Sequence, residues 1–167
     1  QQEDSEAANI NWWNEFAGYC ESINPDVYLV GEVWQDDKVL ENYVQPFDTK
    51  FDFAIQQKIL NCVQKGMAVP GFGDSLSVAI ENIQNKYDGV DVNYLNGVFG
   101  ANHDQDRIAS SVNSLDKARQ IAAVYMTLPG NPYIYYGEEL GMYGSKPDEM
   151  IRTPFLWGDD STYNTSW

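Results

Sequence analysis

The chain has 167 residues, of which 43% are hydrophobic and 14% aromatic, enough apolar material for one domain with a hydrophobic core. Twenty-five acids against ten Lys and Arg give a formal net charge of −15. A field of that sign repels phosphate backbones and anionic lipid surfaces, so we expect no nucleic-acid partner and no electrostatic docking to a membrane.

The first predicted element is a helix over residues 7–23, because apolar side chains recur there at steps of three and four. Asn24 and Pro25 end it. Residues 27–30 form a short, wholly apolar run, which is typical of a strand buried on both faces. The opening residues QQEDSEAAN resemble neither a targeting segment nor a natural N-terminus.

Further along, KFDFAI (50–55) is a second strand candidate that passes without a clear boundary into a helical pattern ending at Gly66. Ser75 is the expected N-cap of a third helix, whose apolar positions run from Leu76 to Tyr87.

A third strand-like run, NYLNGVFGANHD (93–104), precedes a helix that Ser114 caps and that extends to about residue 128. PYIYYGEELGM (132–142) supplies a fourth apolar strand.

Strands and helices therefore alternate, which indicates a parallel sheet with helices packed outside it. Doubly wound sheets and (β/α)₈ barrels both fit, but no GxGxxG or P-loop glycine pattern follows any strand. Acids do follow the strands, as Glu32, Asp104 and the pair Glu138 and Glu139. Ligands of parallel sheets bind at those carboxyl ends. Because a barrel takes about 250 residues, four strands in this chain would make half of one.

The stretch FGANHDQDR (99–107) holds the single histidine of the chain, and three simple interpretations compete for it. An EF-hand calcium loop fails because Ile108 stands where the third oxygen ligand belongs. One histidine with two distant cysteines is a poor zinc ligand set, so we predict no metal site. A solvated charge cluster is the remaining simple alternative.

Carboxylates gathered from several strand ends also match the chemistry of glycoside hydrolysis. One carboxyl group protonates the leaving oxygen, a second attacks the anomeric carbon or activates water, and a third acid helps to keep the first protonated. Trp34, two positions after Glu32, could offer a flat face to a sugar ring or could equally be a core residue.

Five segments resemble the α-amylase family, the family 13 glycoside hydrolases, in their usual order. They are VYLVGEVW (27–34), FDTKFDF (47–53), FGANHDQDR (99–107), PYIYYGEELGM (132–142) and IRTPFLW (151–157). The resemblance implies an α/β fold that is a partial (β/α)₈ TIM barrel, strands five to eight with intervening helices. It makes residues 1–167 the C-terminal half of a catalytic barrel domain.

The resemblance also implies roles for particular residues. Glu32 matches the general acid/base, and Asp104 matches the carboxylate that binds sugar hydroxyls and stabilises the transition state. His103 matches a hydrogen-bonding partner of the sugar, and Arg107 a supporting residue. Asn102 and Trp34 are placed with them as substrate-binding residues. Glu138 and Glu139 look structural or loop-positioning.

One departure from the family pattern is important. The family nucleophile is an aspartate in a G-x-R-x-D stretch, and these residues contain no such stretch. We therefore expect a retaining hydrolase of starch-type α-1,4-glucans that is inactive as this chain alone. We also expect it to pair with the missing barrel half or with itself. The resemblance leaves calcium possible in the full-length protein and suggests an extracellular location.

Three alternatives stay open at this point. The enzyme could be an α-1,6-glucosidase or a transglycosylase of the same family. The chain could be a non-catalytic relative used for carbohydrate binding or protein assembly. A doubly wound domain unrelated to sugars would make all five matches a coincidence.

Overall fold

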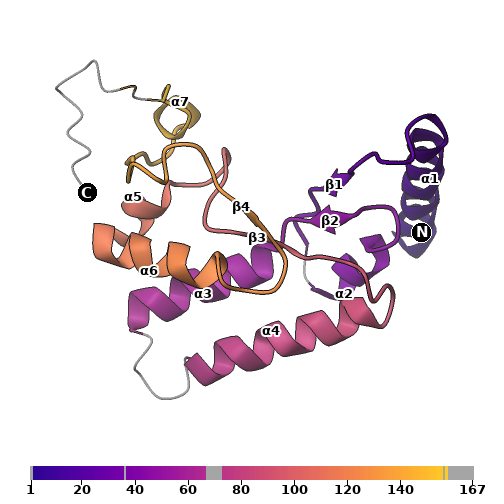
Figure 1. Ribbon diagram of the computed structural model, residues 1–167, viewed down its shortest axis with the longest axis horizontal. Helices are drawn as coiled ribbons and strands as arrows, with labels where there is room; N and C mark the ends of the chain where they lie inside the picture. The colour runs from indigo at the N-terminus through magenta and orange to yellow at the C-terminus, as the bar shows by residue number, and fades with distance from the viewer. Residues whose placement is uncertain (1, 36, 67–72, 156, 158–167) are drawn as a thin grey trace.

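The computed structural model describes residues 2–35, 37–66, 73–155 and 157. In Figure 1 the short strands run in a row across the molecule, with α1 at one end and α5, α6 and α7 at the other. The elements, in chain order, are α1 (Gln2–Ile23), β1 (Val30–Gly31), α2 (Asp37–Leu40), a 3₁₀ turn η1 (Glu41–Tyr43), β2 (Thr49–Lys50), α3 (Phe53–Lys65), α4 (Gly73–Asp88), β3 (Gly97–Phe99), α5 (Ile108–Val112), α6 (Leu115–Tyr125), β4 (Asn131–Tyr133) and α7 (Asp148–Ile151).

The strands are parallel, as the alternation predicts. β1 pairs with β2, with Val30 opposite Thr49, and β3 pairs with β4, with Gly97 opposite Asn131. A single parallel bridge from Phe51 to Gly97 joins the two pairs. The strands therefore follow chain order across an open sheet, and their carboxyl ends lie along one edge.

Two helix caps show how the local sequence sets boundaries. Asp52 accepts a hydrogen bond from the Ile55 backbone N–H at 2.8 Å and starts α3, so Phe53 belongs to a helix and not to the predicted strand. The prediction for Ser114 is confirmed, since its hydroxyl accepts from the Lys117 N–H at 3.3 Å. The prediction for Ser75 is wrong, because α4 begins at Gly73 and Ser75 lies inside it.

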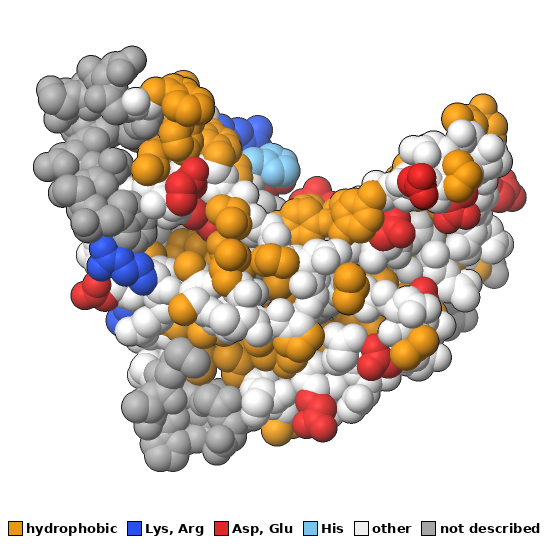
Figure 2. Space-filling view, viewed as in Figure 1, with side chains coloured by type: hydrophobic (Ala, Val, Ile, Leu, Met, Phe, Trp, Pro, Cys, Tyr) orange, Lys and Arg blue, Asp and Glu red, His pale blue; other side chains and the backbone are white. Residues whose placement is uncertain are grey.

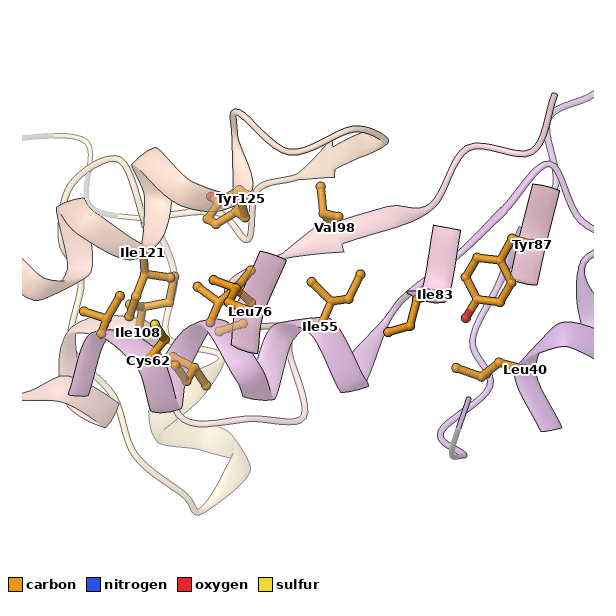
Figure 3. Packing of buried hydrophobic residues seen from close by; sticks show 14 of the residues in the cluster. Leu40, Ile55, Cys62, Leu76, Ile83, Tyr87, Val98, Ile108, Ile121 and Tyr125 are labelled. Atoms are coloured by element: carbon orange, nitrogen blue, oxygen red, sulfur yellow. The ribbon is translucent and has the colours of Figure 1, made fainter. Parts of the chain in front are cut away.

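The hydrophobic core lies between the strands and the helices α3, α4 and α6, as Figure 3 shows. Ile59 and Val63 of α3 are 1% exposed, and Tyr87 of α4 and Ile121 of α6 are fully buried. Burial of each such side chain contributes roughly 1.5–3 kcal/mol, so packing holds these short strands in place.

The prediction that residues 27–30 are buried on both faces is wrong. Tyr28 is 51% exposed and Val30 is 38% exposed. In β1 the exposed Val30 alternates with Gly31, which is buried against the Phe47 ring, so only one face of this strand is covered in the part of the chain that the structure describes. β3, by contrast, has a strand on each side and is buried throughout.

A buried lysine joins β2 to α4. The ammonium of Lys50 donates a hydrogen bond to the Tyr94 hydroxyl at 3.0 Å and lies 3.9 Å from the centre of the Tyr87 ring. Burial lowers the pKa of Lys50 to about 8, and the nearby negative charge of Asp52 opposes that shift. Asp52 also accepts a hydrogen bond from the Asn96 amide at 2.9 Å, which ties α3 to the segment before β3.

Among the described residues, no helix is both long and apolar enough to cross a membrane.

Candidate functional site

The candidate site is built from three loops that leave the carboxyl ends of β1, β3 and β4, at residues 32–35, 100–107 and 134–142. We refer to them together as the carboxyl-end rim. Figure 2 shows a hollow in this face, between the part that carries the single histidine and the part formed by α1. A parallel sheet places these loops on one edge, which is where its ligands bind.

Asp104 lies in a tight turn that Asn102 shapes. The Asn102 side-chain oxygen accepts a hydrogen bond from the Asp104 backbone N–H at 3.0 Å. One oxygen of the Asp104 carboxylate lies 3.3 Å from Nε2 of His103, and the other lies 2.5 Å from an Arg152 nitrogen. The Asp104 side chain is 36% exposed, so its carboxylate is accessible from solvent.

The loop after β1 contacts the loop after β3 through α3. The Trp34 indole stacks on Phe53, and Phe53 meets Phe99 of β3 edge to face at 5.1 Å. Gln56 of α3 donates a hydrogen bond to the Gly100 carbonyl at 2.8 Å. An open pocket of about 440 Å3 is lined by Trp34, Phe53 and Gln56 of this contact together with Gln105. Trp34 is 58% exposed, so it presents one ring face to that pocket.

Glu32 follows β1 directly and is exposed. It lines a groove of about 280 Å3 beside α1, together with Trp13, Phe16 and Phe47. No hydrogen bond or ion pair joins Glu32 to Asp104 in the part of the chain that the structure describes. Their strands are separated by β2 alone, which puts the two strand ends roughly 10 Å apart along the same edge. The two acids are thus on one rim but not in contact.

Arg107 has a different position from the one predicted for a substrate-binding residue. It is 1% exposed, and its guanidinium donates to the Tyr136 carbonyl at 2.7 Å while lying over the rings of Tyr135 and Tyr136. Its backbone N–H donates to the Gly144 carbonyl at 2.9 Å. Because the side chain is enclosed by the loop after β4, Arg107 holds that loop and does not face the hollow.

Asn102 is also more buried than expected of a residue that contacts a sugar, at 8% exposed. Its oxygen is committed to the Asp104 turn, and its amide nitrogen is buried with no hydrogen-bond partner among the described residues. Its position therefore explains the shape of the loop, and its predicted contact with substrate has no support from this geometry.

Glu138 and Glu139 have separate structural tasks. Glu139 accepts a hydrogen bond from the Gly137 N–H at 2.8 Å and closes the turn after β4. Glu138 accepts one from the Tyr125 hydroxyl of α6 at 2.8 Å. Burial raises the pKa of Glu138 to about 7, while the Tyr125 hydrogen bond and the charge of Arg107 oppose that rise. Both acids serve the loop, in line with the loop-positioning role predicted for them.

Sequence reasoning missed Arg152 as a site residue. It lies 48 residues from Asp104, and no spacing rule connects the two positions. The only available signal is its place in IRTPFLW (151–157), one of the five segments that resemble the α-amylase family.

Clusters of metal-ligating side chains were sought among the described residues. No group of three or more His, Cys, Asp or Glu side chains within them is arranged to hold a metal ion. Ile108 begins α5 as an apolar core residue, so its side chain supplies no oxygen ligand after Asp104 and Asp106.

The fold and these loops define a segment of a β/α-barrel protein whose acids lie at the carboxyl ends of its strands. The family "Alpha amylase, catalytic domain" matches residues 2–165. Alpha-amylase 3 of Dictyoglomus thermophilum is 42% identical over 169 residues, covering 98% of this chain and 32% of the relative. A 4-alpha-glucanotransferase of Thermotoga neapolitana is 32% identical, covering 91% of this chain and 32% of the relative.

Among solved structures, the α-amylase from H. orenii superimposes with a TM-score of 0.81 at 35% identity. That likeness covers 95% of this chain and 34% of the solved one. The chain belongs to the α-amylase family, whose members matched here include glycoside hydrolases and a transglycosylase. It spans about a third of the length of these two curated relatives.

Proposed function

We propose that this chain forms strands five to eight of the catalytic barrel of a retaining hydrolase that cleaves α-1,4-glucosidic bonds in starch-type glucans. The observation that carries the proposal is the placement of Glu32, His103 and Asp104 after β1 and β3, on one edge of a parallel sheet. Membership of the α-amylase family supports the same chemistry.

In the proposed reaction, Glu32 protonates the glycosidic oxygen as the bond to the anomeric carbon breaks. A carboxylate on the opposite face attacks that carbon and forms a glycosyl–enzyme ester. Glu32, now deprotonated, removes a proton from water, and the resulting attack releases the sugar with retained configuration. Asp104 and His103 bind the hydroxyls of the sugar being cleaved, and Trp34 offers a flat ring face to a neighbouring sugar.

The attacking carboxylate is proposed to come from sequence outside these 167 residues, because they contain no G-x-R-x-D stretch. The chain alone is therefore proposed to be inactive on α-glucans. A polymeric substrate favours an extracellular site of action.

Exposed apolar side chains on α1 support a partner for the open end of the sheet. Trp12, Phe16, Tyr19 and Ile23 recur at steps of four, three and four and are 38–68% exposed, so they form one stripe along the helix. This helix lies beside β1, because Trp13 and Phe16 line one groove with Val30 and Gly31. We propose that the remaining barrel half covers this surface, and that a second copy of the chain does so if that half is absent.

A transglycosylase is the second candidate, favoured by the 32% identity to the 4-alpha-glucanotransferase of T. neapolitana. The two activities share the glycosyl–enzyme ester and differ in whether water or a sugar hydroxyl receives the glycosyl group. The ratio of reducing ends released to longer oligosaccharides formed from maltotriose distinguishes them. We propose hydrolysis as the main activity, because Alpha-amylase 3 is 42% identical. An α-1,6 specificity would show as release of glucose from isomaltose.

The proposal is tested with a hybrid enzyme in which these 167 residues replace the matching segment of Alpha-amylase 3 of D. thermophilum. We expect the hybrid to release reducing sugar from starch and the 167-residue chain alone to release none. Glu32→Gln and Asp104→Asn should each lower kcat by roughly a thousandfold or more, since each removes a group that acts in the transition state. Glu81→Gln, on the exposed face of α4, is the matched control and should leave kcat unchanged.

Three results would contradict the proposal. The first is starch hydrolysis by the chain alone. The second is a folded hybrid, as judged by circular dichroism and light scattering, that has no activity on any α-glucan. The third is full activity after Glu32→Gln.

A further inference from the structure

Arg152 connects the end of α7 to the loop that carries Asp104. Its Nε donates a hydrogen bond to the His103 carbonyl at 2.8 Å, and one terminal nitrogen donates to the Asp104 carboxylate at 2.5 Å. One guanidinium therefore contacts both the backbone and the side chain of the same turn. The guanidinium is planar and rigid, so the donor that holds the backbone also fixes the direction from which the second donor reaches one oxygen of the carboxylate.

Arg152 lies at the C-terminal end of α7, in a segment that the loop after β4 holds in place. Its side chain also pairs with Asp148 one helical turn earlier at 3.0 Å, and Asp148 pairs in turn with Lys146. The neighbouring backbone is anchored by two tyrosines, since Tyr135 donates to the Ile151 carbonyl at 3.1 Å and Tyr136 donates to the Thr153 carbonyl at 2.7 Å. A side chain with four rotatable bonds is thus confined at its base and at its tip.

The contacts divide the two oxygens of Asp104 between different neighbours. Oδ1 receives the Arg152 nitrogen, and Oδ2 lies 3.3 Å from His103 Nε2. The Asn102 side chain fixes the backbone of the same turn by accepting the hydrogen bond of the Asp104 N–H. With the arginine removed, the turn would keep its backbone hydrogen bond, but one carboxylate oxygen would lose its partner and the carboxylate could rotate.

We propose that Arg152 is a positioning residue that orients the Asp104 carboxylate for the transition state. This inference rests on the proposed function, because it needs Asp104 to act on the sugar. Arg152 acts through Asp104, so its loss lowers kcat and leaves substrate affinity nearly unchanged. If Arg152 instead bound the sugar directly and equally in the ground and transition states, its loss would raise KM and leave kcat unchanged.

The test uses the hybrid enzyme with Arg152→Ala, Arg152→Lys and the control Arg119→Ala. Arg119 lies on α6 and forms an exposed ion pair with Asp116. We expect Arg152→Ala to lower kcat by roughly 10–100-fold with KM within about twofold. Arg152→Lys should recover part of kcat, because an ammonium keeps the charge but cannot reproduce the two-donor fork. Arg119→Ala should change neither constant.

A rise in KM at constant kcat would overturn the inference, and so would unchanged kinetics in both Arg152 variants. An inactive parent hybrid would instead count against the proposed function, which separates the two failures. A second measurement does not depend on activity. In the 167-residue chain, the signal of the Arg152 terminal Nη–H that bonds Asp104 should exchange slowly with water in ¹⁵N NMR, and Asp104→Asn should accelerate that exchange. An Nη–H signal that is insensitive to Asp104→Asn would overturn the inference whatever the kinetics.

Discussion

The indole of Trp34 stacks on the ring of Phe53, with centroids 4.4 Å apart and 10° between the ring planes. Phe53 is 6% exposed and belongs to α3, whereas Trp34 is 58% exposed and belongs to the loop after β1. A buried ring thus sets the position of an exposed one. The same buried ring contacts Phe99 of β3, so the two loops of the candidate site share one support.

Phe53→Ala should therefore destabilise the fold and displace Trp34. We expect the free energy of unfolding to fall by about 3–5 kcal/mol, the usual range for truncating a buried phenylalanine. Urea denaturation followed by tryptophan fluorescence measures it. Phe16→Ala removes an equally large ring that is 38% exposed, and it should lower the free energy by about 1 kcal/mol or less. Similar losses in both variants would contradict the supporting role of Phe53.

Glu138 should make the fold less stable as the pH rises. Its pKa is raised from 4.5 to about 7, so the folded state favours the neutral acid. The contribution of Glu138 to the free energy of unfolding is full below pH 4.5 and is lost as the pH rises toward 7. Glu138→Gln keeps an acceptor for Tyr125 and cannot ionise. We expect it to raise the free energy of unfolding by up to about 3 kcal/mol near pH 8 and to change it little at pH 4.5.

Urea denaturation at the two pH values gives this difference, with the exposed Glu81→Gln as control. An equal effect of Glu138→Gln at both pH values would show that ionisation of Glu138 is not the cause.

Lys50 should have the opposite pH dependence. Its pKa is lowered from 10.5 to about 8, so the folded state favours the neutral amine. Burial of the charged ammonium destabilises the fold fully below pH 8, and this destabilisation disappears as the pH rises toward 10.5. Stability should therefore increase over that range.

Lys50→Met keeps the length of the side chain and removes its charge, at the loss of the hydrogen bond to Tyr94. Near pH 7 we expect it to raise the free energy of unfolding by about 1–2 kcal/mol, and this gain should shrink by about pH 9.5. Lys58→Met, at an exposed position of α3, should have no such pH dependence. A gain of the same size at both pH values would refute the assignment to Lys50.

Replacing Arg107 should lower the free energy of unfolding and leave substrate affinity unchanged. Arg107→Ala leaves the Tyr136 carbonyl without its donor and opens a cavity under the loop after β4. We expect a loss of about 2–4 kcal/mol in the free energy of unfolding, with KM unchanged for the folded fraction of the hybrid enzyme. Arg119→Ala serves as the exposed control. A large rise in KM without a loss of stability would restore the substrate-binding role predicted for Arg107.

Local signals predicted the periodic elements well. The helix over residues 7–23 is present as part of α1, and the helix capped by Ser114 is α6. Strand order and parallel pairing followed from the alternation of elements. The short elements α2 and α5 were not predicted, because four or five residues are too few to show a helical period.

For this protein, the sequence alone determined the parallel α/β class and the family. It also identified Glu32, His103 and Asp104 as residues of the carboxyl-end rim. Those features depend on periodicity and on motifs that are contiguous in the chain. Only the tertiary structure decided that Arg107 is enclosed and that Arg152 contacts Asp104. Burial and ion pairing depend on which segments meet in space, and Arg152 and Asp104 meet because the loop after β4 holds the end of α7 beside the loop after β3.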